Sequence, residues 1–170
     1  SGSSTQNLGV EPDINLPTLF NIDELGESSL DRALDHDSIP GTTVKNFNRV
    51  SNYKDILRKL SLDRVEESPL FKSIKARKQW QSENKSEFLD LNLDKRIEQK
   101  NSIEKFLLAN ENNLRGSLNL PTYESYKDFM DREDDPESLD IESEILGEAA
   151  NILIDLVELK KEPLMAMNQK

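Results

Sequence analysis

The sequence predicts a mainly α-helical domain with an extended N-terminal arm and irregular acidic connectors. Three observations support this class. Apolar residues recur every three or four positions over residues 137–161, as on one face of a helix. Leu, Ile, Val and Phe make up 46 of the 170 residues, which is more than a wholly disordered chain contains. There is no cysteine, so neither a disulfide framework nor a thiolate metal site holds the fold together.

The N-terminal arm begins with turn residues. Gly9 permits a turn, Pro12-Asp13 favours a second, and Ile14 and Leu16 then alternate with polar neighbours. This pattern predicts a short strand at residues 8–17. A single strand is unstable in water without partners, and the chain downstream offers no obvious sheet for it.

Two helices are predicted after the arm. The first covers about residues 51–66. The second begins at Ser68-Pro69, where serine provides an N-cap and proline suits the first turn. The apolar residues expected to anchor these two helices are Tyr53, Ile56, Leu57, Leu60, Val65, Leu70, Phe71 and Ile74.

The next stretch mixes extended and helical patterns. Residues 88–93 alternate and predict a short extended segment. A helix is predicted over about residues 94–113, closed by Gly116 and interrupted near Asn101-Ser102, where Ser102 is able to cap a new start. Residues 117–135 are predicted to form an irregular acidic connector, pinned to a surface by Tyr123, Tyr126 and Phe129.

The last helix carries the widest apolar stripe. Asp135-Pro136-Glu137 is predicted to start it, with a cap, an early proline and an acid near the positive end of the helix dipole. A stripe this wide predicts a core helix that other elements cover. One face consists of Ile141, Ile145, Ala149, Ile152, Leu156 and Leu159, and Leu146, Ala150, Leu153 and Val157 widen it.

Charge is unevenly distributed over a net −11. Residues 1–40 carry −7, residues 41–122 carry +5 and residues 123–148 carry −9. A basic middle is compatible with nucleic-acid binding, but +5 over so many residues, with no reader motif, indicates a solvated helical surface instead. We therefore predict no nucleic-acid partner. The absence of a long apolar run and of a signal peptide pattern predicts no integral membrane segment.

Candidate chemistry is sparse. The pattern S-x-x-K, a serine nucleophile one turn from a lysine base, occurs at Ser51/Lys54, Ser82/Lys85 and Ser102/Lys105. Chance explains such pairs in a chain this rich in serine and lysine, and the companion motifs of that enzyme class are missing. On solvated faces these lysines are poor bases.

Metal and histidine chemistry are also not predicted. Residues 90–94 resemble the start of a calcium loop, but Lys95 stands where the loop needs glycine and Asn101 where it needs glutamate. The acids Asp131, Glu133, Asp134 and Asp135 suit a solvated connector, and His36 has no nucleophile signature near it. No catalytic, cofactor-binding or metal-binding residue is therefore predicted, and no cofactor is expected.

The N-terminal segment SGSSTQNLGVEPDINLPT resembles the closing segment of the peptidase domain in tail-specific proteases, the C-terminal-processing serine peptidases. Its matches to the pattern G-x-S-T-Q-x-x-G-V-x-P-D-I are Gly2, Ser4, Thr5, Gln6, Gly9, Val10, Pro12, Asp13 and Ile14. A second block, residues 26–40, is similar to the A-L-P-W-D-S-I signature of the large Gram-negative members. Ala33, Leu34, Asp37, Ser38 and Ile39 fit it, whereas Asp35 and His36 replace Pro-Trp.

Three later blocks, ESPLFKSI, LDLNLDKRIEQKN and EILGEAANILIDLVELKK, resemble the helical C-terminal region of the same family in order and spacing. The resemblance implies that residues 1–40 end the peptidase domain and link it onward, residues 41–163 form a C-terminal helical domain, and residues 164–170 form a flexible tail. The predicted strand then belongs to a sheet whose other strands lie upstream.

The resemblance further implies a noncatalytic part of a periplasmic serine endopeptidase that cleaves proteins with nonpolar C-termini. In that family a Ser/Lys dyad and a PDZ domain do the cleavage and capture, and neither is expected in these 170 residues. The implied partners are the upstream peptidase and PDZ domains and protein substrates, with a lipoprotein adaptor and contact with the inner membrane face left open. The alternative is an independent acidic helical interaction protein without enzymatic activity.

Overall fold

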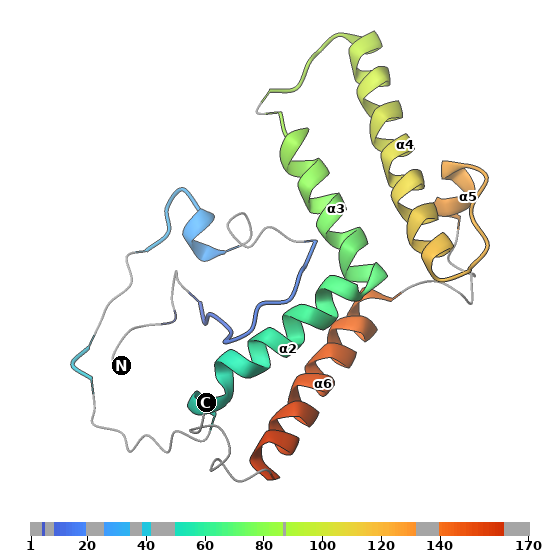
Figure 1. Ribbon diagram of the computed structural model, residues 1–170. Helices are drawn as coiled ribbons and strands as arrows, with labels where there is room; N and C mark the ends of the chain where they lie inside the picture. Colours follow the sequence, from blue (N-terminus) through green and yellow to red (C-terminus); the bar gives the residue numbers. More distant parts are fainter. Residues whose placement is uncertain are drawn as a thin grey trace. The chain divides into compact units, whose positions relative to one another are not determined.

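The computed structural model describes residues 5, 9–19, 26–34, 39–41, 50–86, 88–131 and 140–161. Helices dominate these residues and none of them forms a strand, so the predicted mainly α class is confirmed (Figure 1). Residues 9–19 consist of bends and irregular backbone. The strand predicted there depends on a sheet outside this chain, and it stays a prediction.

The chain forms two compact units. The first consists of residues 1–62 together with 149–170, and the second consists of residues 63–148. Helices α2 (Lys54–Glu67) and α6 (Ile141–Lys161) each contribute residues to both units. None of the described helices is long and apolar enough to cross a membrane.

In the first unit, the 3-10 turn η2 (Ser51–Tyr53) leads directly into α2. The buried apolar side chains of the first unit are Tyr53 and Leu57. The N-terminal segment is tied to this helix through Asp13, whose carboxylate pairs with Lys54 and whose carbonyl oxygen accepts from the Arg58 guanidinium at 3.1 Å. A further short 3-10 turn, η1 (Glu27–Ser29), is exposed.

In the second unit, α3 (Pro69–Glu83) and α4 (Leu93–Ser117) lie side by side (Figure 1). The predicted start of α3 is confirmed, because the Ser68 hydroxyl accepts from the Phe71 amide and proline occupies the first turn. The Trp80 and Phe106 rings stack with centroids 4.6 Å apart. The buried apolar side chains of this unit are Val65, Leu70, Phe71, Ile74, Leu114 and Phe129.

Two predictions about α4 are wrong. The helix runs without a break through Asn101-Ser102, and it continues past Gly116. The residue that takes a positive φ, of 57°, is Asn119 instead, because asparagine also tolerates the left-handed conformation. The start of α4 is capped by the Asn92 side chain, which accepts from the Lys95 amide at 3.2 Å.

The connector after α4 is more regular than predicted. It contains the short helix α5 (Tyr126–Met130), which begins with a capping box in which Ser125 and Asp128 each accept from the other's backbone amide. Pinning by aromatic residues is confirmed for Phe129, which is buried and whose ring lies 5.7 Å from that of Tyr123.

The end of α4 is clamped onto the same connector. The Arg115 guanidinium donates to the Pro121 carbonyl oxygen and, at 2.9 Å, to the Tyr123 hydroxyl, and it lies 4.4 Å from the Tyr123 ring centroid. The Asn112 side chain makes paired 2.9 Å hydrogen bonds with the backbone of Tyr123. Together these contacts hold residues 121–123 against the last turns of α4.

Helix α6 begins later than predicted. Asp140 is its N-cap, since its carboxylate accepts from the backbone amides of Glu142 at 3.0 Å and Ser143 at 3.2 Å. The predicted start at Asp135-Pro136-Glu137 lies outside the described residues.

The first half of α6 is held within the second unit by two side-chain contacts. Glu148 is buried and accepts two 2.9 Å hydrogen bonds from the Arg64 guanidinium, at the end of α2. The Ser68 hydroxyl donates to Glu144 at 2.8 Å. A carboxylate without such a donor is costly to bury, so the arginine fork explains how a glutamate occupies this position.

Candidate functional site

An apolar cavity of about 290 Å³ lies in the first unit. Its walls come from residues 13–14, the start of α2 and the second half of α6. A cavity with this lining suits one or two nonpolar side chains of a bound peptide rather than a polar metabolite. The apolar residues that line it are Ile14, Val50, Leu57, Ala149, Ile152, Leu153 and Leu156.

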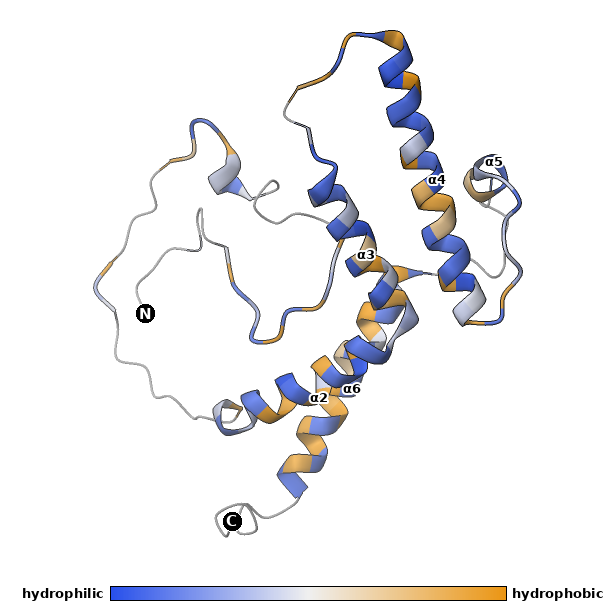
Figure 2. Ribbon diagram, turned by 45° about the horizontal axis from the view of Figure 1, so that its top comes forward, coloured by the Kyte–Doolittle hydropathy of each residue, from blue (hydrophilic) through white to orange (hydrophobic). Residues whose placement is uncertain are grey.

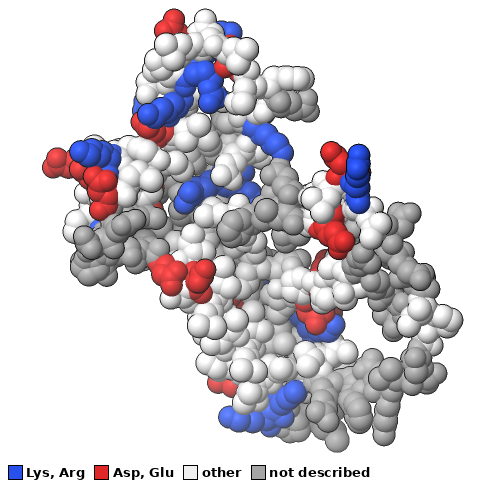
Figure 3. Space-filling view, turned by 180° about the vertical axis from the view of Figure 1, so that it is seen from behind, with Lys and Arg blue, Asp and Glu red and all other residues white. Residues whose placement is uncertain are grey.

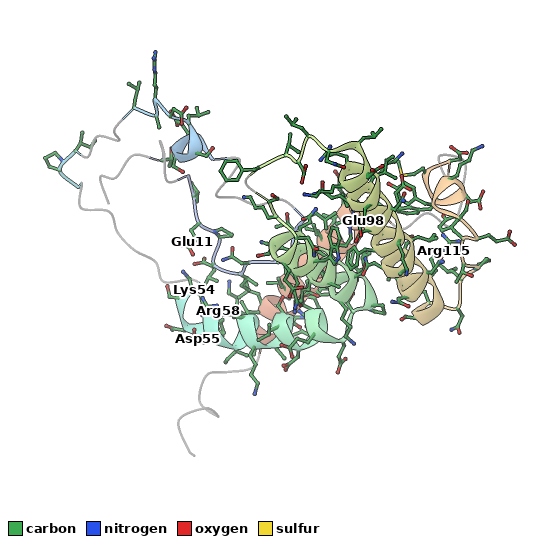
Figure 4. All side chains as sticks on the ribbon, turned by 90° about the horizontal axis from the view of Figure 1, so that it is seen from above. Glu11, Lys54, Asp55, Arg58, Glu98 and Arg115 are labelled. Atoms are coloured by element: carbon green, nitrogen blue, oxygen red, sulfur yellow. The ribbon has the colours of Figure 1, made fainter. Side chains whose placement is uncertain are left out.

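Paired charges border this cavity. Asp13 and Lys54 form part of its lining, and they pair with each other. One turn further along α2, Arg58 donates to the Asp13 carbonyl oxygen and to Asp55 at 3.1 Å (Figure 4). The two acids and two bases cancel, so the border of the cavity carries no net charge and favours neither sign of charge in a ligand.

A second hollow lies along the first half of α4. It has a volume of about 520 Å³ and is open to solvent between α4 and the start of α5. Its lining mixes charged and apolar groups, which gives it less chemical definition than the apolar cavity. The residues that line it are Arg96, Ile97, Gln99, Lys100, Ile103, Glu104 and Tyr126.

The serines of the three S-x-x-K pairs lie on the surface of the described residues. Ser51, Ser82 and Ser102 are all exposed. Lys54, the lysine of the first pair, bonds to Asp13. An exposed serine hydroxyl is a weak nucleophile unless a base is held against it.

The segment similar to a calcium loop is a helix cap. Asp90 accepts from the Lys95 ammonium at 2.8 Å and from the Asn92 amide at 2.9 Å. These two donors, the lysine first, lower the pKa of the Asp90 carboxyl, because each stabilises the ionised form. The carboxylate is therefore engaged by the start of α4.

No group of three or more His, Asp or Glu side chains able to hold a metal ion occurs in the part of the chain that the structure describes. Of the acidic run after α5, Asp131 is exposed. His36 and the acids Glu133, Asp134 and Asp135 lie outside the described residues.

The charges of the described surface lie in small groups of both signs. In the view from behind, the described residues show no broad field of Lys and Arg (Figure 3). Phosphate-backbone binding relies on such a field, so this face does not resemble a nucleic-acid interface.

The apolar cavity was missed by reasoning from the sequence. Ile14 was assigned to a strand and α6 to a buried core, so their meeting with α2 was not predicted. The signal that did exist is the breadth of the α6 stripe, which exceeds one helix face and needs more than one covering element.

Comparison with known proteins supplies the family. The model of a family described as the C-terminal domain of tail specific protease matches residues 20–158. A curated relative, the tail-specific protease of Haemophilus influenzae, is 31% identical over 163 residues. That match covers 92% of this chain but 22% of the relative's length. The chain therefore belongs to the family of C-terminal domains of tail-specific proteases.

Proposed function

We propose that this chain is the noncatalytic helical portion of a periplasmic serine endopeptidase, where it acts as a scaffold and as a contact surface for protein substrates with nonpolar C-termini. Family membership supports the link to a protease. The large part of the relative's length that the chain does not span leaves room for the Ser/Lys dyad and the PDZ domain elsewhere in a parent protein.

The observation that carries the contact role is the apolar cavity of the first unit. Its lining side chains come from α2, α6 and the N-terminal segment, so they form a concave apolar surface. A substrate that is being unfolded exposes nonpolar side chains, and such a cavity holds them by burying their surface. The neutral rim of Asp13 and Lys54 offers hydrogen bonds to the substrate backbone.

The proposed division of labour follows from what each step requires. A short unfolded peptide needs only tail capture, in which it adds as a strand and its carboxylate is read by backbone amides, followed by cleavage at the dyad. A folded substrate must also be held while it opens. We therefore assign the contacts that hold a partly unfolded substrate to the apolar cavity of this chain.

The test compares two substrates that share the same nonpolar tail, a short peptide and a folded protein. Removing the region that corresponds to residues 45–170 from the parent is expected to slow cleavage of the folded protein more than cleavage of the peptide. Melting of the truncated enzyme is measured alongside, because an exposed docking surface also destabilises the remaining domains. A common slowing of both substrates, with the core still folded, contradicts the contact role.

A matched pair of variants sharpens the test without deletion. Val50→Glu places a charge at the cavity, at a residue that is already 36% exposed, whereas Leu62→Glu places the same charge on an exposed residue of α2 outside the cavity lining. We expect only Val50→Glu to lower the ratio of folded-substrate to peptide rates. Equal effects of the two variants contradict a role for the cavity.

A further inference from the structure

Helix α6 presents an apolar face to solvent, which adjoins the apolar cavity at Leu153. Leu146 is 71% exposed, Leu153 60%, Ile154 54% and Val157 45%. Figure 2 shows hydrophobic residues along most of this helix. Large apolar side chains grouped in this way on one helix mark an interaction surface.

The spacing of this face is that of a helix–helix seam. Leu146, Ala150, Leu153 and Val157 follow one another at intervals of four, three and four residues. These are the a and d positions of two successive heptads, which in coiled coils face a partner helix. The face therefore has the form that a second helix recognises.

Gly147 gives an independent indication. Glycine is among the poorest helix formers, and here it lies inside a 21-residue helix. Nothing lies within 4 Å of the place that a Cβ atom would take. Packing among the described residues therefore does not require glycine, whereas the close approach of another helix would favour it.

The charges at the two ends of α6 indicate how a partner helix runs. Asp140 caps the start and exposed Glu142 lies in the first turn, whereas Lys160 and Lys161 end the helix. A copy of α6 in the opposite direction brings acids against bases at both ends, and it also opposes the helix dipoles favourably. A parallel copy brings like charges together.

We propose that α6 pairs antiparallel with α6 of a second copy of this chain. With the twofold axis near residues 151–152, Ala150 faces Leu153 of the other copy and Leu146 faces Val157. Ile154 then covers Gly147, and Glu142 lies beside Lys160. In this register Gly147 and Ala150 each face a large apolar residue, and the pairing of Glu142 with Lys160 occurs twice in the dimer. The proposal does not depend on the protease function.

The contact is expected to be weak. A single pair of short helices lies at the low end of specific interface sizes, so a dissociation constant on the order of micromolar is expected. The primary measurement is the mass of the 170-residue chain by sedimentation over a wide concentration range. We expect a reversible monomer–dimer equilibrium.

Variants test which face is used. Leu153→Glu is expected to weaken association by at least about tenfold, because it places a charge at the centre of the seam. Leu62→Glu, at an exposed position on α2, is the matched control and is expected to leave association unchanged. Both positions are exposed, so the monomer should stay folded, which circular dichroism checks.

The charge swap tests the partner and its direction together. Glu142→Lys alone and Lys160→Glu alone each place like charges side by side twice per dimer, and each should weaken association by about threefold or more. The double variant restores both pairs and should return the affinity to near its original value. Recovery of this kind is expected only if the partner is a second, antiparallel copy.

Four outcomes would overturn the proposal. They are a monomer at all concentrations, a dimer that is insensitive to Leu153→Glu, charge variants whose effects add without recovery in the double variant, and protection of this face only by a different protein or by other domains of a longer chain.

Discussion

Helices α3 and α6 bury their apolar residues to opposite extents. Most residues of α3 are polar, yet Leu70, Phe71 and Ile74 are all buried. Helix α6 is much richer in apolar residues, but the residue of it that is buried is Glu148 (Figure 2).

The difference between α3 and α6 shows that the amount of apolar surface on a helix and the molecule that covers this surface are separate properties. The number of apolar residues on a helix indicates how much surface must be covered. It does not indicate which molecule covers it. For α3 the cover comes from this chain, because its few apolar residues lie on one narrow face. For α6 the apolar residues extend around the helix, and this chain covers only part of them.

The largest expected effect on stability comes from comparing a buried residue of α3 with an exposed residue of α6. Phe71→Ala should lower the free energy of unfolding by about 3–5 kcal/mol, since Phe71 is buried and a cavity would remain. Leu153→Ala should cost less than about 1 kcal/mol, because that side chain is already mostly in water and alanine favours helix. Thermal unfolding of dilute samples measures both. Equal shifts would show that α6 is buried after all.

The buried ion pair gives the next effect. Glu148→Ala should cost about 3 kcal/mol, the lower end for a broken buried pair, because Arg64 keeps a third of its side chain in water. Asp55→Ala, which removes the exposed pair with Arg58, is the control and should cost less than about 1 kcal/mol. If added salt removes most of the stability difference between Glu148→Ala and the unchanged protein, the ion pair is exposed to solvent and Glu148 is not buried.

Ile152 tests the inner face of α6. From the sequence alone, full burial would predict a cost of about 2–5 kcal/mol for Ile152→Ala. The side chain is half-buried at the apolar cavity, which reduces the expectation to about 1–2 kcal/mol. Exposed Glu158→Ala should change stability by less than about 0.5 kcal/mol. A larger loss for Glu158 than for Ile152 would reverse the face assignment.

The smallest effect concerns the cap of α6. Hydrogen bonds from Ser143 and from the Glu142 amide lower the pKa of the Asp140 carboxyl. A lowered folded-state pKa means that the cap stabilises the helix above the unfolded value near pH 4, and that this contribution is lost as the pH falls through the lowered pKa.

Amide protection in the first turn of α6, followed by NMR from about pH 5 to about pH 2, should therefore decrease toward acid. In Asp140→Asn the side chain keeps an acceptor oxygen but does not titrate in this range, so its protection should be lower and independent of pH. An identical pH profile in the two proteins would exclude Asp140 as the origin.

The sequence predicted the helices better than their ends. The start of α3 was predicted because Ser68-Pro69 combines two signals at one place. The start of α6 at Ile141 was not, because the cap at Asp140 is a single signal in the sequence and lacks the neighbouring proline that marks the start of α3. The break at Asn101-Ser102 was wrong because these residues cost a helix little, and the anchored second half of α4 extends through them.

The candidate site could be predicted only in part. The expectation that no catalytic residue lies in this chain rests on residue spacing and stays a prediction. The apolar cavity was not, because it joins Ile14 to Leu57 and Ile152 from distant parts of the chain. The burial of Glu148 was equally hidden, since its partner Arg64 lies 84 residues away.

That distance has a consequence for the order of folding. Closing the 84-residue loop between Arg64 and Glu148 costs roughly 2 kcal/mol more chain entropy than closing the eight-residue loop between Arg115 and Tyr123. The turn that joins α4 to α5 therefore forms early, from local contacts, and α6 docks late. During synthesis on the ribosome, the contacts among α3, α4 and α5 can form before Glu148 is available to pair with Arg64.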